Sequence, residues 1–196
     1  QLPPNTITRL SYSGGTTGKP KAIPGSPRVG AQAMQIMLTD WEWPINPRIL
    51  AVVPLSHAGG SLFGPMVLKN GTMVVLPYFE PGAVLKAIQD YRISCTMLVP
   101  TMIYALLDHP DFDKYDLSSL ETVFYGASLM SPARMKEALE RIGPVFFQFY
   151  GQAEAPMTVT VMRKSEHDPN NPLRLASCGR PVPWLDVALL DNDNTE

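Results

Sequence analysis

Short apolar runs, rich in β-branched and aromatic residues, recur along the chain with room for a helix between them. Such runs are typical of strands that are buried on both faces of a sheet. They predict strands over 49–53, 72–76, 95–99, 121–125 and 145–150. A further strand is predicted over 7–13, ahead of a glycine-rich segment.

Apolar residues also recur at helical spacing in the segments between these runs. They predict helices over 29–38, 83–92, 102–108 and 132–142. The last of these has the clearest boundaries, because Ser131 is a preferred N-cap residue and Pro132 suits the first helical position. Glu137 and Arg141 are spaced to form an ion pair on its exposed face.

Strands that alternate with helices predict crossover units, and therefore an α/β fold with a mostly parallel sheet. Two apolar segments near the C-terminus, 158–162 and 185–190, predict a small extra strand region that could form a second sheet. The polar, Pro-rich segment 164–183 predicts an irregular connection. We expect one α/β subdomain over 1–163, and over 164–196 the connection and the start of the next subdomain.

Composition narrows the class of protein. The 196 residues carry 16 Lys and Arg against 18 Asp and Glu, a net charge of −2, which argues against binding to nucleic acid. Cys95 and Cys178 are too few for a disulfide scaffold or a four-cysteine zinc site. No apolar run approaches the ~18 residues of a membrane span, and the N-terminus does not resemble a signal peptide. We expect a cytoplasmic protein, and a piece of a longer chain because the first residue is not Met.

The ends of the predicted strands carry the candidate chemistry. Open parallel sheets bind ligands outside the carboxyl ends of their strands. His57 follows the first predicted buried strand, Ser128 follows a later one, and Glu154 follows the strand over 145–150. Small residues such as Gly126 and Gly151 precede two of these side chains and allow close approach of a ligand to the backbone.

The segment 13–21 is the most informative, because glycines, hydroxyls and two lysines are clustered there. Its backbone N–H groups suit an anion-binding nest for polyphosphate. It is not a Walker A loop, since Ser13 stands where Gly is needed and Pro20 stands where Ser or Thr is needed. Pro20 also disfavours a helix directly after Lys19.

This segment resembles the phosphate-binding motif of the adenylate-forming superfamily, which includes the acyl-CoA synthetases. The segments 54–57, 126–128, 150–154 and 177–183 resemble further motifs of that family, in the same order. The resemblance implies that the chain is the central part of the family's large domain. It also implies a ligase that activates a carboxylic acid with ATP as an acyl-adenylate and transfers the acyl group to coenzyme A.

The resemblance also implies roles for individual residues. Lys21, His57 and Glu154 are the expected catalytic residues, with Glu154 as a ligand of Mg²⁺ and His57 between nucleotide and acid. Tyr150 is expected to stack on adenine. The residues expected to hold ATP or AMP are Ser13, Gly14, Gly15, Thr16, Thr17, Gly18, Lys21, Gly126, Ala127, Ser128, Gln148, Phe149, Tyr150, Gly151, Gln152 and Ala153.

Three positions depart from the family pattern. Gly14 stands where Ser is frequent, Ala22 where Gly is usual, and Ala153 where a Thr usually contacts the α-phosphate. The family's ribose-binding Asp and C-terminal Lys are not in the chain. An alternative hypothesis is therefore a module that binds nucleotide or acyl-adenylate with little catalysis.

A second alternative is another adenylating enzyme, such as a peptide-synthetase adenylation domain. Such domains usually carry an Asp for the substrate amine, and 54–60 offers no acid, so an apolar, fatty acid fits better. Met102, Ile103 and Tyr104, with Leu62 and Phe63, are candidates for the acyl pocket, although an ordinary core explains them equally well. We expect only small-molecule substrates as partners, with self-association, including a homodimer, through uncovered apolar surface.

Overall fold

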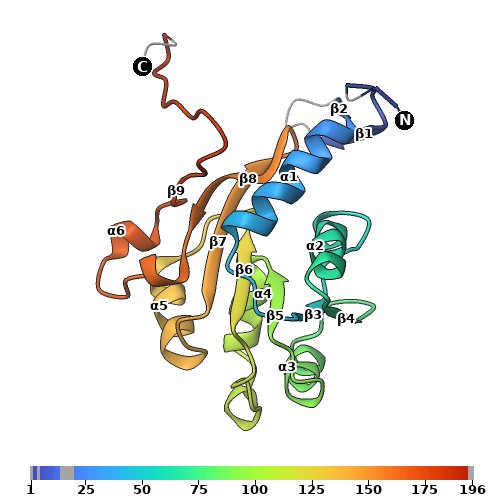
Figure 1. The fold of residues 1–196 in the computed structure, drawn as a ribbon. Helices are drawn as coiled ribbons and strands as arrows, with labels where there is room; N and C mark the ends of the chain where they lie inside the picture. Colours follow the sequence, from blue (N-terminus) through green and yellow to red (C-terminus); the bar gives the residue numbers. More distant parts are fainter. Residues whose placement is uncertain (1, 4, 14–19, 194–196) are drawn as a thin grey trace.

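The computed structural model describes residues 2–3, 5–13 and 20–193. The expected phosphate-binding residues Gly14, Gly15, Thr16, Thr17 and Gly18 lie outside the described residues, as does the side chain of Ser13. Helices and strands otherwise occur in the alternating order that the sequence predicts (Figure 1).

The centre of the fold is a seven-stranded sheet with the order β4-β3-β5-β6-β7-β8-β9. Its strands are β3 (Arg48–Ala51), β4 (Thr72–Val75), β5 (Cys95–Leu98), β6 (Thr122–Gly126), β7 (Phe146–Gln152), β8 (Ala155–Met162) and β9 (Arg180–Pro181). The first five in spatial order are parallel, β8 runs antiparallel to β7, and β9 runs antiparallel to β8. The predicted α/β fold with a mostly parallel sheet is confirmed.

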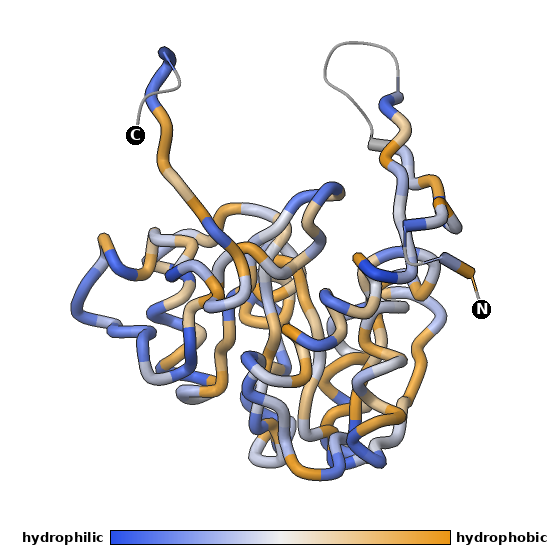
Figure 2. The backbone as a smooth tube through the Cα atoms, turned by 45° about the horizontal axis from the view of Figure 1, so that its top comes forward, coloured by the Kyte–Doolittle hydropathy of each residue, from blue (hydrophilic) through white to orange (hydrophobic). Residues whose placement is uncertain are grey.

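Helices cover both faces of this sheet. On one face, α1 (Pro27–Asp40) and α2 (Phe63–Leu68) pack through residues such as Ile36 and Met66. On the other, α3 (Pro81–Asp90), α4 (Pro100–Leu107) and α5 (Pro132–Arg141) form a second apolar cluster. Figure 2 shows long apolar stretches through the middle of the molecule and more polar colour in its peripheral loops. The sheet therefore separates two apolar layers.

The predicted helix 132–142 is confirmed with small differences. Ser131 is the N-cap residue, but its side chain makes no capping bond, and its backbone N–H instead donates to the Tyr104 hydroxyl at 2.8 Å. The expected pair of Glu137 and Arg141 forms at 3.2 Å. Arg141 also lies over the Phe112 ring, 4.1 Å from its centroid. The contacts with Tyr104 and Phe112 join α5 to α4 and to the segment that follows it.

The C-terminal predictions need correction. The segment 158–162 belongs to β8 of the main sheet, because the tight turn after β7 returns the chain beside that strand. The segment 185–190 forms no strand, since it runs away from the sheet without a neighbouring strand to pair with (Figure 1). The segment 164–183 is not wholly irregular: it contains η3 (Lys164–Glu166), α6 (Pro172–Leu175) and β9. A domain boundary at 163–164 stays a prediction.

A separate two-stranded antiparallel sheet precedes α1. It consists of β1 (Arg9–Ser13) and β2 (Lys21–Gly25), with Ser13 opposite Lys21. The sequence did not predict β2, because Pro24 and Gly25 are unfavourable in strands. The expectation that no helix directly follows Pro20 is correct, since β2 begins at Lys21.

Candidate active site

A cavity of about 660 Å³ lies at the carboxyl ends of the parallel strands, where the sequence predicts a ligand site. The hairpin β1–β2, helix α1, the start of α2 and the turns after β3, β6 and β7 contribute to its wall. Its lining residues are Thr8, Arg9, Gly25, Ser26, Pro27, Val29, Gly30, Ala33, Met34, Met37, Val53, His57, Ala58, Gly60, Ser61, Gly64, Met97, Leu98, Val99, Ala127, Phe149, Gly151, Gln152, Ala153, Pro156 and Met157. The wall is largely apolar, and none of these residues has a carboxylate side chain.

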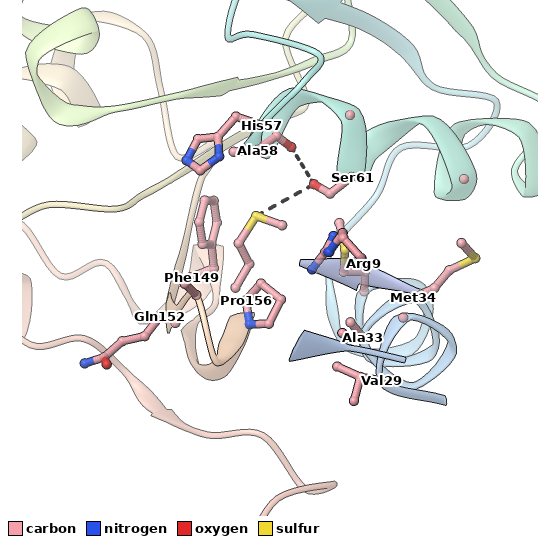
Figure 3. A pocket seen from close by; sticks show the side chains of 18 of the residues that line it. Arg9, Val29, Ala33, Met34, His57, Ala58, Ser61, Phe149, Gln152 and Pro156 are labelled. Carbon is pink, nitrogen blue, oxygen red and sulfur yellow. Dashed lines mark hydrogen bonds between the residues drawn. The ribbon is translucent and has the colours of Figure 1, made fainter. Parts of the chain in front are cut away.

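The chain turns sharply after β3 and brings His57 to the cavity. The short helix η1 (Ala58–Leu62) starts directly after His57, and a side chain at Gly59 would lie only 2.5 Å from the Val53 carbonyl oxygen. Glycine is therefore needed for this close approach. Ser61 on η1 donates to the Ala58 carbonyl at 2.5 Å and contacts the Met157 sulfur at 3.7 Å (Figure 3). The imidazole of His57 is exposed.

The turn after β6 brings backbone rather than side chains to the site. A Cβ on Gly126 would overlap the carbonyl oxygen of Phe149 and lie 2.9 Å from its ring, so only glycine allows this pairing. Ala127 follows with a positive φ of 68°, lines the cavity, and turns the chain away from the sheet. Ser128 is exposed beyond it. Such a turn leaves backbone groups open to a flat ligand.

The turn between β7 and β8 carries the expected nucleotide motif. A register shift between Tyr150 and Gln152 interrupts the pairing of the two strands. Gln152 and Ala153 then line the cavity, and the Gln152 amide donates to the Tyr150 hydroxyl at 3.0 Å. Glu154 lies exposed in the same turn. The tyrosine ring and the carboxylate are therefore both accessible to a ligand.

The side chains of successive residues of β7 lie on opposite faces of the sheet. Phe149 lines the cavity and stacks on Trp41, with ring centroids 5.0 Å apart and planes 15° from parallel. Gln148 is buried in the sheet, is not among the cavity residues, and its Oε1 atom has no hydrogen-bond partner within the described part of the chain. The structure thus brings Phe149, but not Gln148, to this cavity.

Lys21 stands at the end of the hairpin β1–β2 where the glycine-rich segment joins the two strands. Its backbone pairs with Ser13, so the two ends of the glycine-rich segment are adjacent. Lys21 is exposed and is not among the cavity residues. The Lys21 side chain is therefore exposed at the hairpin end opposite the one that lines the cavity.

None of the five residues that the sequence suggests for an acyl pocket lines this cavity. Leu62 and Ile103 are fully buried in the two apolar clusters, where they support the sheet. The apolar wall comes instead from one face of α1, through Gly30, Ala33 and Met34 with Met37 one turn further. The spacing of these residues was the available signal, but small and apolar side chains carry no recognisable chemistry.

The described side chains do not form a complete metal site by themselves. Within residues 2–3, 5–13 and 20–193, no three His, Cys, Asp or Glu side chains form a group that could hold a metal ion. Mg²⁺ in nucleotide sites needs only one or two protein carboxylates, because phosphate and water supply the other ligands. Glu154 fits that role as a single exposed carboxylate. None of the described helices is long and apolar enough to cross a membrane.

The parallel sheet, the cavity at its strand ends and the motif turns around it define an open-sheet α/β domain that binds a small ligand. The sequence profile of the family described as AMP-binding enzyme matches residues 1–196. The chain therefore belongs to the AMP-binding enzymes, as the motif resemblance implied.

The chain is also similar to individual proteins of known activity or structure. The chain is 55% identical over 190 residues to the medium/long-chain-fatty-acid–CoA ligase FadD8 of Mycobacterium tuberculosis, covering 97% of this chain and 33% of that protein. It is 32% identical to a feruloyl-CoA synthase of an Amycolatopsis species, covering 93% of this chain and 37% of that one. The structure of the amide bond synthetase McbA from Marinactinospora thermotolerans matches with a TM-score of 0.83 and 31% identity, over 95% of this chain and 37% of McbA. The chain spans about a third of the length of these relatives.

Proposed function

We propose that this chain forms the nucleotide- and acid-binding part of an ATP-dependent acyl-CoA synthetase for fatty acids. The observation that carries the proposal is the cavity, whose apolar wall ends at the three motif turns. Among its described lining residues there is no Asp or Glu to pair with a substrate amine, which favours an apolar acid over an amino acid. FadD8, a relative at 55% identity, is a fatty-acid–CoA ligase.

The geometry supports a division of the site into two parts. We assign the nucleotide to the turns after β6 and β7, with adenine beside Gly126, Ala127 and Ser128 and against the Tyr150 ring. We assign the β- and γ-phosphates to Lys21 and the glycine-rich segment before it. The acid lies in the cavity with its carboxylate beside His57. The exposure of Lys21, His57, Ser128 and Tyr150 supports these assignments.

The reaction needs positioning and charge stabilisation more than covalent help from the protein. The acid's carboxylate attacks the α-phosphorus of ATP, and the bond to the pyrophosphate oxygen breaks, giving acyl-adenylate and pyrophosphate. Lys21 holds negative charge on the leaving phosphates, and His57 orients the carboxylate. Glu154 would hold Mg²⁺, which neutralises phosphate charge when bound. The coenzyme A thiol then takes the acyl group and releases AMP.

The experiment is acid-dependent exchange of pyrophosphate into ATP, measured on the protein that the full reading frame encodes. We expect exchange with fatty acids, and a loss of ~10-fold or more in Glu154→Gln, which keeps the shape and removes the charge. Glu140→Gln is the matched control, since Glu140 is exposed on α5. No exchange with any carboxylic acid would overturn the proposed function. Unchanged exchange in Glu154→Gln would overturn only the role of Glu154.

Ala153 favours one alternative, a module that binds nucleotide with little catalysis. It lines the cavity in the β7–β8 turn and offers no hydroxyl to an α-phosphate. This alternative predicts binding of ATP or acyl-adenylate without exchange, so the same assay separates it from the ligase.

The acceptor and the cellular setting are part of the proposal. McbA is an amide bond synthetase, which makes an amine the alternative acceptor to coenzyme A. Product analysis with coenzyme A, and separately with an amine, decides between them. We place the protein in the cytoplasm, and a homodimer stays a prediction to be checked by light scattering.

A further inference from the structure

His57 and Gln152 lie on one side of the cavity, and Val29, Ala33 and Met34 of α1 lie on the other, with the Arg9 side chain of β1 beside them (Figure 3). An acid whose carboxylate lies at His57 therefore directs its tail toward α1 and α2. The residues at that end are the ones a long tail reaches last.

Met34 closes this end by lying over Gly64 at the start of α2. A Cβ built on Gly64 would lie 2.5 Å from the Met34 methyl carbon and 3.3 Å from its sulfur. The thioether therefore occupies the place that a side chain on Gly64 would take. Met34 is half-buried, and both residues line the cavity. Methionine is flexible and unbranched, so it can fill such a gap.

Gly30 lies one turn before Met34 on α1. It leaves open space beside the helix, whereas Met34 fills the space beside it. A Cβ built on Gly30 meets nothing within 4 Å, although Gly30 also lines the cavity. The wall of α1 is therefore open beside Gly30 and closed at Met34. A tail that fills the cavity meets no side chain at Gly30 and meets the thioether at Met34.

We propose that Met34, seated on Gly64, is the stop that sets the length of the acyl chain this enzyme accepts. The proposal rests on the proposed function, because it assumes that the cavity holds the acid. Met34 and Gly64 act as specificity-determining residues and take no part in the reaction. The position of the Met34 methyl group decides how many methylenes fit between His57 and α2.

Three variants move the stop in predictable directions. Gly64→Ala pushes the end of Met34 into the cavity and shortens the preferred acid. Met34→Ala removes the stop and lengthens it. The double variant loses the shortening, because the truncated side chain on α1 leaves room for the new methyl group on α2. A general loss of folding would not be reversed in this way.

A fourth variant fills the cavity without displacing a neighbour. Gly30→Leu places its side chain in open space and shortens the preferred acid independently of Gly64. Ala31→Leu is the matched control, because Ala31 is exposed on the same helix and is not among the residues of this cavity. It should leave the length preference unchanged.

The experiment measures kcat/KM and binding by calorimetry for a homologous series of saturated fatty acids, on the full-length protein and its variants. We expect the ratio of kcat/KM between neighbouring members to change by about 10-fold or more at the length limit. The limit should shift in opposite directions for Gly64→Ala and Met34→Ala. Active variants that all keep the wild-type length limit would overturn the role of Met34. A wild-type protein that neither binds nor activates any acid would instead overturn the proposed function, and this inference with it.

Discussion

The hydroxyl of Tyr125 lies 2.9 Å from Nε2 of His167, 42 residues later in the chain. The other ring nitrogen of His167 lies 2.8 Å from the Arg163 carbonyl oxygen. Because a carbonyl only accepts, Nδ1 carries the proton, and Nε2 accepts from the Tyr125 hydroxyl. This pair ties the segment after β8 to β6, and burial favours the neutral imidazole.

This arrangement makes stability depend on pH. Burial lowers the pKa of His167 from its usual value, although the hydrogen bond to the Arg163 backbone acts against the shift. The unfolded chain therefore takes up the proton more readily, so the free energy of unfolding decreases as pH falls below about 6.5. We expect urea unfolding to show a larger loss between pH 7.5 and pH 5 in the wild type than in His167→Gln. Equal losses in both proteins would contradict this account.

Gly126 and Gly30 should respond oppositely to the same substitution. Gly126→Ala places a methyl group against the Phe149 carbonyl oxygen, so we expect severe destabilisation or failure to fold. Gly30→Ala lies in open space within α1 and should stabilise by about 0.4–1 kcal/mol, because alanine restricts the unfolded chain. Thermal unfolding of the two variants tests this, and a stable Gly126→Ala protein would show that β6 and β7 can separate at this point.

The two cysteines should differ sharply in reactivity. Burial raises the pKa of the Cys95 thiol to about 12, which leaves almost no thiolate at neutral pH. Cys178 is exposed. Brief alkylation of the native protein followed by peptide mapping should find the label on Cys178 alone. Rapid labelling of Cys95 would mean that β5 opens far more often than its burial indicates.

Ala153 offers a test by gain of function. It lines the cavity beside Gln152, where the family usually has Thr. Ala153→Thr should speed pyrophosphate exchange by ~10-fold or more, since a hydrogen bond to a charged group contributes about 1.5–3 kcal/mol. Ala153→Ser is the partial version, and Ala153→Val, which adds bulk without a hydroxyl, is the control. Equal rates in the Thr and Val variants would exclude the hydroxyl effect.

The sequence predicts the core of the fold well, for a physical reason. Strands buried on both faces must be apolar throughout, so β3, β5 and β6 are recognisable as continuous runs. Local composition hides β2 and α2, because Pro24 and Gly25 lie in the strand and Gly64 and Pro65 in the helix. The pairing of β8 depends on the turn before it, which periodicity alone does not reveal.

The sequence likewise predicts one part of the candidate site and not the other. The rule for strand ends correctly leads to His57, Ala127 and the turn over 151–153 as parts of one cavity. The wall formed by α1 was missed, since Gly30 and Ala33 matter through the space they leave. Residues that act by their small size become visible only when their neighbours are known.

The hairpin β1–β2 is hydrogen-bonded to neither edge of the main sheet in the described part of the chain, yet Thr8, Arg9 and Gly25 line the cavity. A two-stranded hairpin is marginally stable by itself. Its backbone amides should therefore exchange with deuterated water much faster than those of β5, β6 and β7. Ligand bound between hairpin and sheet would slow that exchange, so occupancy of the site can be followed from the protection of β1 and β2 alone.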